Sequence, residues 1–392
     1  MLPLEGVTVV AVEQAVAAPF ASRQLADLGA RVVKIERPGS GDFARAYDTT
    51  VKGLASHFVW TNRSKQSATL DLKRPEAAGA LRRLLERADV FLHNLAPGAV
   101  VRLGFDSAEL RATHPRLITC EISGYGSSGP YRDKKAYDLL IQSEAGLVSI
   151  TGTEETPSKV GISIADIAAG MYAYSAILAA LLRRERTGEG AAVEVSLFDA
   201  LAEWMGYPAY FTEYGGAPPA RTGARHAAIA PYGPYRAGDG KMVYLGLQNE
   251  REWVRFCEQV LNRPELARDP RFSTNSRRVE HHDVLERVIT EAFAHSTAAA
   301  VVQRLDAADI ANARMNTVRE FLDHPQLQAR GRWGEIDSPS GRLRALKPPV
   351  VLDQVECPMG AVPTLGEHTD AVLRELGFDD ATIASWRAAG IV

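Results

Sequence analysis

The first third of the chain alternates short apolar runs with amphipathic stretches of helical period, and this alternation restricts the fold more than any other feature. The runs that have the composition of strands cover residues 7–12, 31–36, 67–72, 90–95 and 116–122. Helical periodicity is clearest in residues 19–30 and 75–88. Continuous apolar runs are typical of strands buried on both faces, and parallel strands need crossover helices between them. The pattern predicts an α/β fold with a parallel sheet covered by helices on both faces.

The sequence changes in texture near residue 215, where a stretch rich in Gly, Pro and Ala begins. Beyond it, one strand pattern at 241–247 precedes several helical patterns, strand and turn character returns at 332–352, and the tail is helical. A change of composition of this kind is typical of a domain boundary. We therefore expect a large domain over 1–215, a small domain over 225–330, and a return to the large domain over 331–392.

The composition is that of an ordinary globular protein, with 392 residues, 46% of them hydrophobic and 24% charged. The net charge of −3 provides no electrostatic footprint for nucleic acid or for an anionic membrane. The first residues have neither the basic flank nor the small-residue cleavage site of a signal peptide. The apolar run 167–182 is short for a membrane span and contains Tyr172, Tyr174 and Ser175. We expect a cytoplasmic protein that binds neither a membrane nor nucleic acid.

The three cysteines, Cys120, Cys257 and Cys357, are far apart in the sequence. Their spacing matches neither a CxxC motif nor a zinc site, and their odd number fits a reducing compartment. We expect no bound metal.

A single carboxylate, Asp166, lies between apolar residues at the start of a long apolar stretch that ends near Thr187–Gly188. Asp is a favoured residue at helix N-termini, so one interpretation is a helix cap. The other is a carboxylate nucleophile beside the small residues Ala168, Ala169 and Gly170, which would let a bulky substrate approach. This stretch by itself leaves both interpretations open.

Neither glycine-rich phosphate motif is present in its full form. The turn after the first strand has no GxGxxG sequence, and the segment 36–42, ERPGSGD, lacks the lysine of a P-loop. Basic residues instead recur near strand ends, at Arg37, Lys73, Arg102 and Lys135. Exposed Lys and Arg are usually solvated, but strand carboxyl ends are where open α/β sheets bind ligands. Cations that converge there would suit a polyphosphate-bearing ligand.

Six segments together resemble the class III CoA-transferases (the CaiB/BaiF family), which include formyl-CoA, carnitine and succinyl-CoA-dependent transferases, with α-methylacyl-CoA racemase as a relative. The segments are LADLGARVVKIERPGSGD, NRSKQSATLDLKRPE, FLHNLAPGAVVRLGF, PRLITCEISGYGSSGPYRDKKAYDLLIQSEAGL, ADIAAGMYAYSAILAALLRRERTGEG and PTLGEHTDAVLRELGF. They follow one another in the family's order and cover essentially the whole chain. Six ordered segments are a far more specific signal than one short motif.

The resemblance implies that Asp166 is the catalytic nucleophile. It also implies a set of contacts to coenzyme A, at Val16, Ala17, Arg37, Leu70, Lys73, Asn94, Arg102, Lys135, Ala136 and Tyr137. For two of these a purely structural role remains open, because Asn94 could cap a turn and Tyr137 could be a core aromatic. No permanently bound cofactor is implied, since the coenzyme A thioester is a substrate.

The implied reaction moves CoA from an acyl-CoA to a carboxylic acid through an aspartyl-CoA thioester. The racemases carry a His-Asp pair where this chain has Tyr137-Asp138, which argues against α-proton exchange. The glycine run of the formyl-CoA transferases is replaced here by a loop with Arg225 and His226, which could receive the second carboxylate of a dicarboxylic acid. We expect succinyl-CoA as donor and a C4–C5 dicarboxylate, such as itaconate, mesaconate, citramalate or malate, as acceptor. An α-methylacyl-CoA racemase-like enzyme and a non-catalytic acyl-CoA-binding protein are the alternatives.

The resemblance also implies a Rossmann-like large domain built from both chain ends, with a smaller α+β domain inserted between them. In this family two chains pass through one another to form an interlocked homodimer, and we expect the same assembly here. Composition and periodicity do not bear on this expectation.

Overall fold

The computed structural model describes all residues, 1–392, and divides into two compact units. The first unit comprises Met1–Ala145, Gly161–Met205 and Gln326–Val392, and the second comprises Gly146–Val160 and Gly206–Pro325. The sequence pattern alone places residues 146–160 and 206–215 in the large domain, whereas the structure groups them with the second unit.

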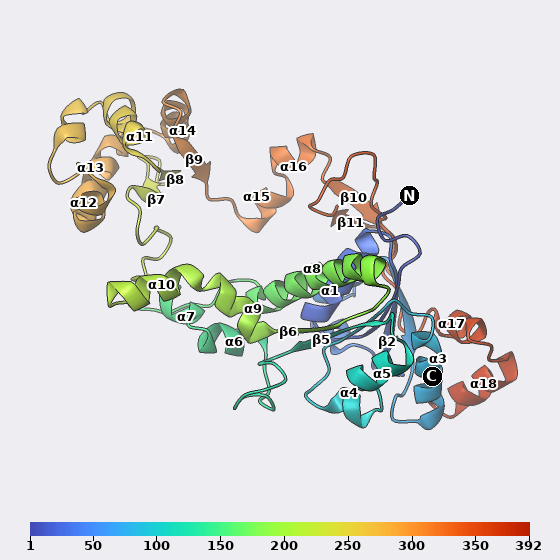
Figure 1. Cartoon of the computed structure of the whole chain (residues 1–392). Helices are drawn as coiled ribbons and strands as arrows, with labels where there is room; N and C mark the ends of the chain where they lie inside the picture. Colours follow the sequence, from blue (N-terminus) through green and yellow to red (C-terminus); the bar gives the residue numbers. More distant parts are fainter. The chain divides into compact units, whose positions relative to one another are not determined.

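The first unit is built on a six-stranded sheet in the order β3-β2-β1-β4-β5-β6 (Figure 1), in which every neighbouring pair is parallel. The strands are β1 Thr8–Val12, β2 Arg31–Glu36, β3 Lys65–Thr69, β4 Val90–His93, β5 Ile118–Ser123 and β6 Ala192–Ser196. This is the strand order of dinucleotide-binding Rossmann folds, in which the order reverses between β1 and β4. The parallel α/β architecture predicted from the alternating pattern is therefore confirmed.

Helices cover both faces of this sheet. The helices of the first unit are α1 Ala17–Asp27, α2 Ser56–Asn62, α3 Pro75–Leu85, α4 Ala99–Arg102, α5 Ser107–Thr113, α6 Asp138–Glu144, α8 Ile164–Thr187, α9 Leu197–Trp204, α16 Pro325–Ala329, α17 Thr369–Glu375 and α18 Asp380–Ala388, with a 3₁₀ turn at Phe43–Ala46. In Figure 1, α1 and α8 lie over one face, and α3, α5 and α17 lie over the other.

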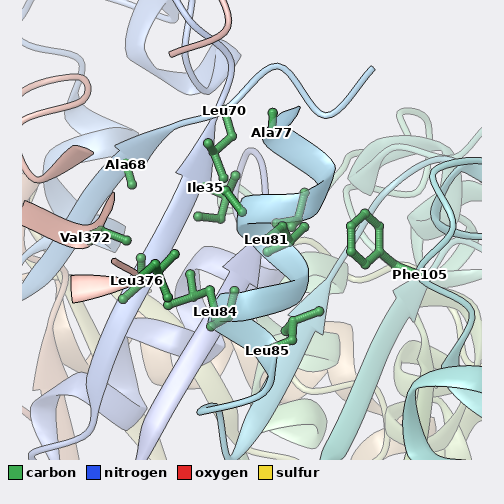
Figure 2. Close-up of a cluster of buried hydrophobic side chains, with 14 of the residues drawn as sticks. Ile35, Ala68, Leu70, Ala77, Leu81, Leu84, Leu85, Phe105, Val372 and Leu376 are labelled. Carbon is green, nitrogen blue, oxygen red and sulfur yellow. The ribbon is translucent and has the colours of Figure 1, made fainter. Parts of the chain in front are cut away.

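Alternate residues of the central strands serve the two faces, as the period of a strand requires. Ile35 points towards α3 and α17, where a buried cluster joins Leu81 and Leu84 of α3 to Val372 of α17 (Figure 2). Lys34, the neighbouring residue in β2, points to the opposite face and is fully buried.

Both ends of the chain contribute to the first unit. Helix α17 follows a segment that is bonded to β3, where the backbone N–H of His368 donates to the carbonyl of Ser67 at 2.8 Å. The side chain of Thr369 accepts from the N–H of Thr69 at 2.9 Å. A hairpin of β10 Trp333–Ile336 and β11 Leu343–Leu346 packs its apolar side chains against Phe58 of α2.

Helix α8 is the longest helix, with 24 residues, and it ends where Gly188 adopts a left-handed conformation with φ 77°. Left-handed glycines are common helix terminators because they lack a Cβ. By length and mean hydropathy of 1.6 the helix could cross a membrane, but 44% of its apolar window is buried inside the protein. It packs against α1, α9, β5 and β6, as a core helix does.

The contact between α8 and α1 depends on one small residue. A Cβ on Gly170 would lie 2.7 Å from the carbonyl oxygen of Ala17 and 2.9 Å from Cδ1 of Phe20. Glycine is therefore the residue that lets the two helix backbones approach this closely.

The second unit is an α+β arrangement around an antiparallel sheet in the order β7-β8-β9. Its strands are β7 Tyr232–Arg236, β8 Met242–Gly246 and β9 Ala311–Arg314. Its helices are α7 Leu147–Ile150, α10 Gly206–Gly215, α11 Glu250–Arg255, α12 Asn275–Glu280, α13 His282–Phe293, α14 Ala298–Ala307 and α15 Val318–Leu322, with a π-helical turn at Phe256–Val260 and a 3₁₀ turn at Pro264–Arg268. A core of its own, with Trp253, Phe256, Phe272 and Phe293 almost fully buried, holds this unit together.

Candidate active site

The parallel sheet brings most of the predicted site residues to one edge. The predicted contacts to coenzyme A follow the carboxyl ends of β1 to β5, and parallel strands end on the same side of a sheet. Helix α8 leads into β6, so it runs back across the sheet and its N-terminus lies at that carboxyl edge. Asp166 is in the first turn of α8. The fold therefore places Asp166 and the predicted contacts of the first unit at one edge.

Asp166 is a carboxylate without an internal partner. It is partly buried, and its side chain makes no hydrogen bond or ion pair with any other residue of the chain. Burial, with a smaller contribution from the negative charge of Asp138, raises the pKa of Asp166 to about 7. A carboxyl group that is costly to ionise and has no stabilising partner is typical of functional sites.

The helix-cap interpretation of Asp166 is wrong. Helix α8 begins at Ile164, its N-cap is Ser163, and Asp166 is the third helical residue. Two of the free amides of the first turn are satisfied by Asp138 instead, whose Oδ1 accepts from the N–H of Ala165 at 2.8 Å and from that of Asp166 at 3.4 Å. Asp166 therefore has no capping role that would occupy its oxygens.

Asp138 thus fixes the first turn of α8 and also acts on the charge of Asp166. Its other oxygen, Oδ2, accepts from Nε2 of Gln142 at 2.7 Å, which holds the carboxylate in place at the start of α6. Asp138 therefore positions the backbone at Asp166 and also disfavours ionisation of the Asp166 carboxyl group.

Two tyrosines belong to the surroundings of Asp166. Burial, together with the negative charges of Asp42 and Asp166 and the nearby Tyr137, raises the pKa of Tyr47 to about 12. Tyr47 and Tyr137 are nevertheless 49% and 67% exposed. Tyr47, which interacts with the charge of Asp166, and its neighbour Tyr137 are therefore both accessible from solvent.

An aromatic row continues from Tyr47 towards α1. The ring of Tyr47 meets His57 edge-on at 5.5 Å between centroids, His57 lies 6.5 Å from Trp60, and Trp60 lies 5.4 Å from Phe20. Phe20 is the residue that Gly170 of α8 allows to approach. These rings form a continuous aromatic row between Tyr47 and α1.

The turn between β1 and α1 carries Val16 and Ala17, both of which are almost fully buried. Asn94, which follows β4, clamps this turn across the point where the strand order reverses. Its Oδ1 accepts from the N–H of Gln14 at 2.9 Å, and its Nδ2 donates to the Gln14 carbonyl at 2.8 Å. Both functional groups of Asn94 are therefore engaged with the backbone, and its contact to coenzyme A stays a prediction.

The predicted cations are free to meet an anionic ligand. Arg37, Lys73, Arg102 and Lys135 are all exposed, and none of them forms an ion pair within the chain. The guanidinium of Arg102 has only a long contact, 3.4 Å, to the carbonyl of Pro97. Exposed cations without acidic partners are suited to bind phosphates. Leu70, by contrast, is a buried core residue at 4% exposure.

The segment Lys135–Tyr137 is held against the end of β5 by a close contact. A Cβ on Gly124 would lie 2.4 Å from Cβ of Ala136. Because Gly124 does not have a left-handed backbone, the space it leaves is the reason for glycine here. The segment that carries Lys135 and Tyr137 is thereby anchored through Ala136.

Arg225 and His226 lie in the second unit. One guanidinium nitrogen of Arg225, Nη1, is 2.5 Å from the ring nitrogens of His282 and 3.6 Å from a carboxylate oxygen of Glu286. The ring of His226 stacks on Tyr232 at 5.3 Å, and its Nδ1 accepts from the N–H of Ala228. Arg225 is therefore partly neutralised by Glu286, and its contact with an acceptor acid stays a prediction.

Sequence reasoning did not assign a role to Asp138, Tyr47 or the charged residues buried under the β1–α1 turn. A usable signal was present for the last group. Lys34 interrupts the apolar strand VVKIE, and a lysine in a strand buried on both faces requires a partner. Asp138 offered no such signal, because its link to α8 spans a long segment of chain.

The raised pKa of Asp166 predicts a pH-dependent stability. Its carboxyl group binds a proton more tightly in the folded chain, with a pKa of about 7 against about 3.9 in the unfolded chain. The stability contributed by this group is therefore complete below pH 4 and is lost as the pH rises to 7, by up to about 4 kcal/mol in free energy of unfolding. Asp166→Asn, which cannot ionise, should gain stability relative to the wild type over this range, as measured by thermal unfolding from pH 4.5 to 8.

Two variants serve as controls for this measurement. Asp138→Asn removes the neighbouring negative charge and should weaken the pH dependence without abolishing it. Asp379→Asn should lose stability by an amount that stays constant from pH 4.5 to 8, because the Thr382 amide and hydroxyl lower the pKa of Asp379 and its carboxyl group is ionised over this whole range. A stability difference between Asp166→Asn and the wild type that does not change with pH would contradict the assignment.

Comparison with known proteins identifies the family of this chain. The model of CoA-transferase family III matches residues 4–369. The chain is 33% identical to a succinate–glutarate CoA-transferase of Agrobacterium fabrum, covering 95% of this chain and 96% of the relative. It is 32% identical to a succinyl-CoA–D-citramalate CoA-transferase of Chloroflexus aurantiacus, covering 100% and 98%.

Solved structures share the fold over nearly the full length. A CAIB/BAIF family protein from Brucella suis is 33% identical, with a TM-score of 0.83 and coverage of 96% of this chain and 99% of that one. Rv3272 from Mycobacterium tuberculosis is 28% identical, with a TM-score of 0.83 and coverage of 95% and 99%. Since family model, relatives and structures agree over almost the whole chain, this protein belongs to CoA-transferase family III and is an enzyme of that class.

Proposed function

We propose that this enzyme transfers CoA from succinyl-CoA to a C4–C5 dicarboxylate, with Asp166 as the nucleophile. The observation that carries the proposal is the Asp166 carboxyl group, which has no internal partner and a raised pKa at the carboxyl edge of the sheet. The class of acids is supported by the names of relatives, which act on glutarate, D-citramalate and L-malate with succinyl-CoA as the CoA donor.

The reaction proceeds in balanced steps from the ionised carboxylate. An oxygen of Asp166 attacks the thioester carbonyl, the C–S bond breaks, and CoA leaves as a thiolate, so that a mixed anhydride remains. The thiolate then attacks the Asp166 carbonyl carbon and releases the donor acid, which leaves an aspartyl-CoA thioester. The acceptor carboxylate attacks this thioester, CoA leaves again as a thiolate, and its attack on the acceptor carbonyl of the new anhydride yields the product thioester and free Asp166.

The residues around Asp166 suit these steps. The anhydride hydrolyses if water reaches it, and the aromatic row from Tyr47 to Phe20 provides an apolar side to the site. The free cations Arg37, Lys73, Arg102 and Lys135 would hold the phosphates of CoA. Arg225, although paired with Glu286, would receive the second carboxylate of the acid.

Replacement of Asp166 by Ala or Asn should abolish CoA transfer, because no other carboxylate lies at this helix start without a partner. The measurement is CoA transfer from succinyl-CoA to a panel of acids, read by mass spectrometry, with hydroxylamine trapping of the wild-type intermediate at Asp166. The value of kcat/KM in the wild type should also fall about tenfold per pH unit below pH 7, since it reports the ionisation of the free enzyme. CoA affinity should stay near the wild-type value in both variants.

Substantial turnover in Asp166→Ala would contradict the nucleophile assignment. Exchange of the α-proton of a 2-methylacyl-CoA with solvent deuterium, at a rate comparable to transfer, would instead favour a racemase.

Arg225→Ala should reduce transfer to dicarboxylates while leaving transfer to monocarboxylates of the same length nearly unchanged. A charge-assisted contact to the second carboxylate is worth about 1.5–3 kcal/mol, or roughly ten- to a hundredfold in kcat/KM. Arg287→Ala, on the exposed face of α13 in the same unit, is the matched control. Equal losses with both kinds of acid would remove the proposed role of Arg225 and leave the transferase intact.

We also propose that the enzyme is a homodimer. Helix α10 exposes four aromatic side chains, and an exposed apolar surface of this kind is typical of an interface. The exposed fractions are 51% for Tyr207, 70% for Tyr210, 42% for Phe211 and 82% for Tyr214. Light scattering after size-exclusion chromatography should give twice the chain mass of 42.6 kDa, and Tyr210→Glu with Tyr214→Glu should lower it. A wild-type mass of one chain at micromolar concentration would contradict the dimer.

A further inference from the structure

Four charged side chains are buried together beneath the turn between β1 and α1. We call Glu13, Lys34, Asp42 and Lys65 the buried tetrad. The side chains of all four residues are fully buried. Nζ of Lys34 lies 2.7 Å from Oδ2 of Asp42 and 3.5 Å from Oε1 of Glu13, and Nζ of Lys65 lies 2.7 Å from the same oxygen of Glu13. Two lysines thus face two carboxylates in the protein interior, where burial lowers the pKa of Lys65 to about 7.

The tetrad is connected to the turn through Asp42. Its Oδ1 accepts from the N–H of Ala15 at 3.0 Å and from that of Ala44 at 2.9 Å, while its Oδ2 is taken by Lys34. Ala15 has φ 63°, a left-handed conformation that a residue with a Cβ rarely adopts. The hydrogen bond that Ala15 donates to Asp42 therefore holds a backbone conformation that Ala15 would not prefer by itself.

The other members of the tetrad fasten the helix that follows. Nζ of Lys65 donates to the carbonyl of Pro19 at 2.9 Å, and Oγ of Ser22 donates to Oε2 of Glu13 at 2.6 Å. Pro19 and Ser22 belong to the first two turns of α1. The tetrad thus fixes the turn and the start of α1 as one piece.

The position of the turn and the start of α1 affects both the predicted CoA contacts and the packing of α8 near Asp166. The turn carries Val16 and Ala17, for which contacts to coenzyme A are predicted. The carbonyl oxygen of Ala17 also lies 2.7 Å from where a Cβ on Gly170 would be, one helical turn beyond Asp166 in α8. A displaced turn would disturb the binding of CoA and the packing beneath the nucleophile together.

We propose that Asp42, backed by Lys34, Glu13 and Lys65, is a positioning residue that sets the β1–α1 turn in the conformation that binds the CoA thioester. This inference rests on the proposed function. Each member of the tetrad is paired with another member, so loss of one leaves a buried group without its partner. The tetrad acts through the turn and does not touch the reacting atoms.

Asp42→Asn removes the oxygen that accepts from the N–H groups of Ala15 and Ala44, and so breaks the link between the tetrad and the turn. An asparagine has one side-chain oxygen, and the buried ammonium group of Lys34 requires it, so the amide NH₂ faces the N–H of Ala15 and the hydrogen bond to the turn is lost. Asp27→Asn is the matched control. Asp27 is equally buried and pairs with Arg23 at 2.7 Å and Arg63 at 2.8 Å, at the far end of α1 from the turn.

The full-length variants are compared by hydrogen–deuterium exchange of residues 14–17, by the Kd of CoA in equilibrium binding, and by thermal unfolding. Asp42→Asn should speed exchange at residues 14–17 and raise the Kd about tenfold, the size expected from one hydrogen bond to a charged group. Asp27→Asn should lower the unfolding temperature while leaving exchange at 14–17 and the Kd within about twofold of wild type. Adding Ala15→Gly to Asp42→Asn should recover part of the CoA affinity, because glycine adopts the left-handed conformation without the hydrogen bond.

Unchanged exchange at residues 14–17 in Asp42→Asn would overturn the proposal. An equal rise in Kd in Asp27→Asn would also overturn it, because the effect would then follow general destabilisation. These readings need no acceptor acid. An absence of CoA transfer in the wild type would therefore count against the proposed function alone, whereas transfer with an unaffected turn would count against the positioning role alone.

Discussion

The parallel sheet with its order reversal between β1 and β4 is the constraint on which the site depends. Five consecutive strand ends meet at one edge, so residues that are far apart in the chain, such as Ala17, Arg37 and Asn94, follow neighbouring strands. The crossover that leads into β6 must run back over the sheet, and this brings the N-terminus of α8 to the same edge. Asp166, the proposed nucleophile in the first turn of that helix, is therefore positioned by the topology itself.

Within this frame the chain treats its buried charges in two opposite ways. Glu36 is buried, which disfavours ionisation, yet Arg45 and Lys34 lower its pKa to about 2. Asp166 has no cationic partner, so burial and the negative charge of Asp138 raise its pKa. The first arrangement stabilises a fixed charge for structural purposes. The second leaves a carboxyl group without a stabilising partner, at a cost in stability that functional sites commonly carry.

The close contact between α1 and α8 links these two arrangements. Gly170 brings the α8 backbone against the carbonyl of Ala17, so the helix that carries Asp166, the proposed nucleophile, rests on the turn that Asp42 and Asn94 hold. Because tightly packed interiors transmit displacements, the position of the turn affects both ends of the site. The charged residues under the β1–α1 turn and Gly170 of α8 therefore act together to set the position of the turn relative to α8.

The sequence by itself determined the parallel α/β class, since the alternation of apolar runs and amphipathic helices admits few other architectures. It also determined the end of the long helix at Gly188, because helix termination depends on local conformation. It pointed to Asp166 because the order of short motifs along the chain matches that of a known family. Only the tertiary structure decided that Asp138 satisfies the first turn of α8, and that Asp42 accepts from Ala15 while Lys34 neutralises it. It also placed residues 146–160 and 206–215 with the second unit. These contacts join segments that are distant in the chain. Which distant residues meet depends on how the whole fold packs, and a local sequence pattern contains no information about that packing.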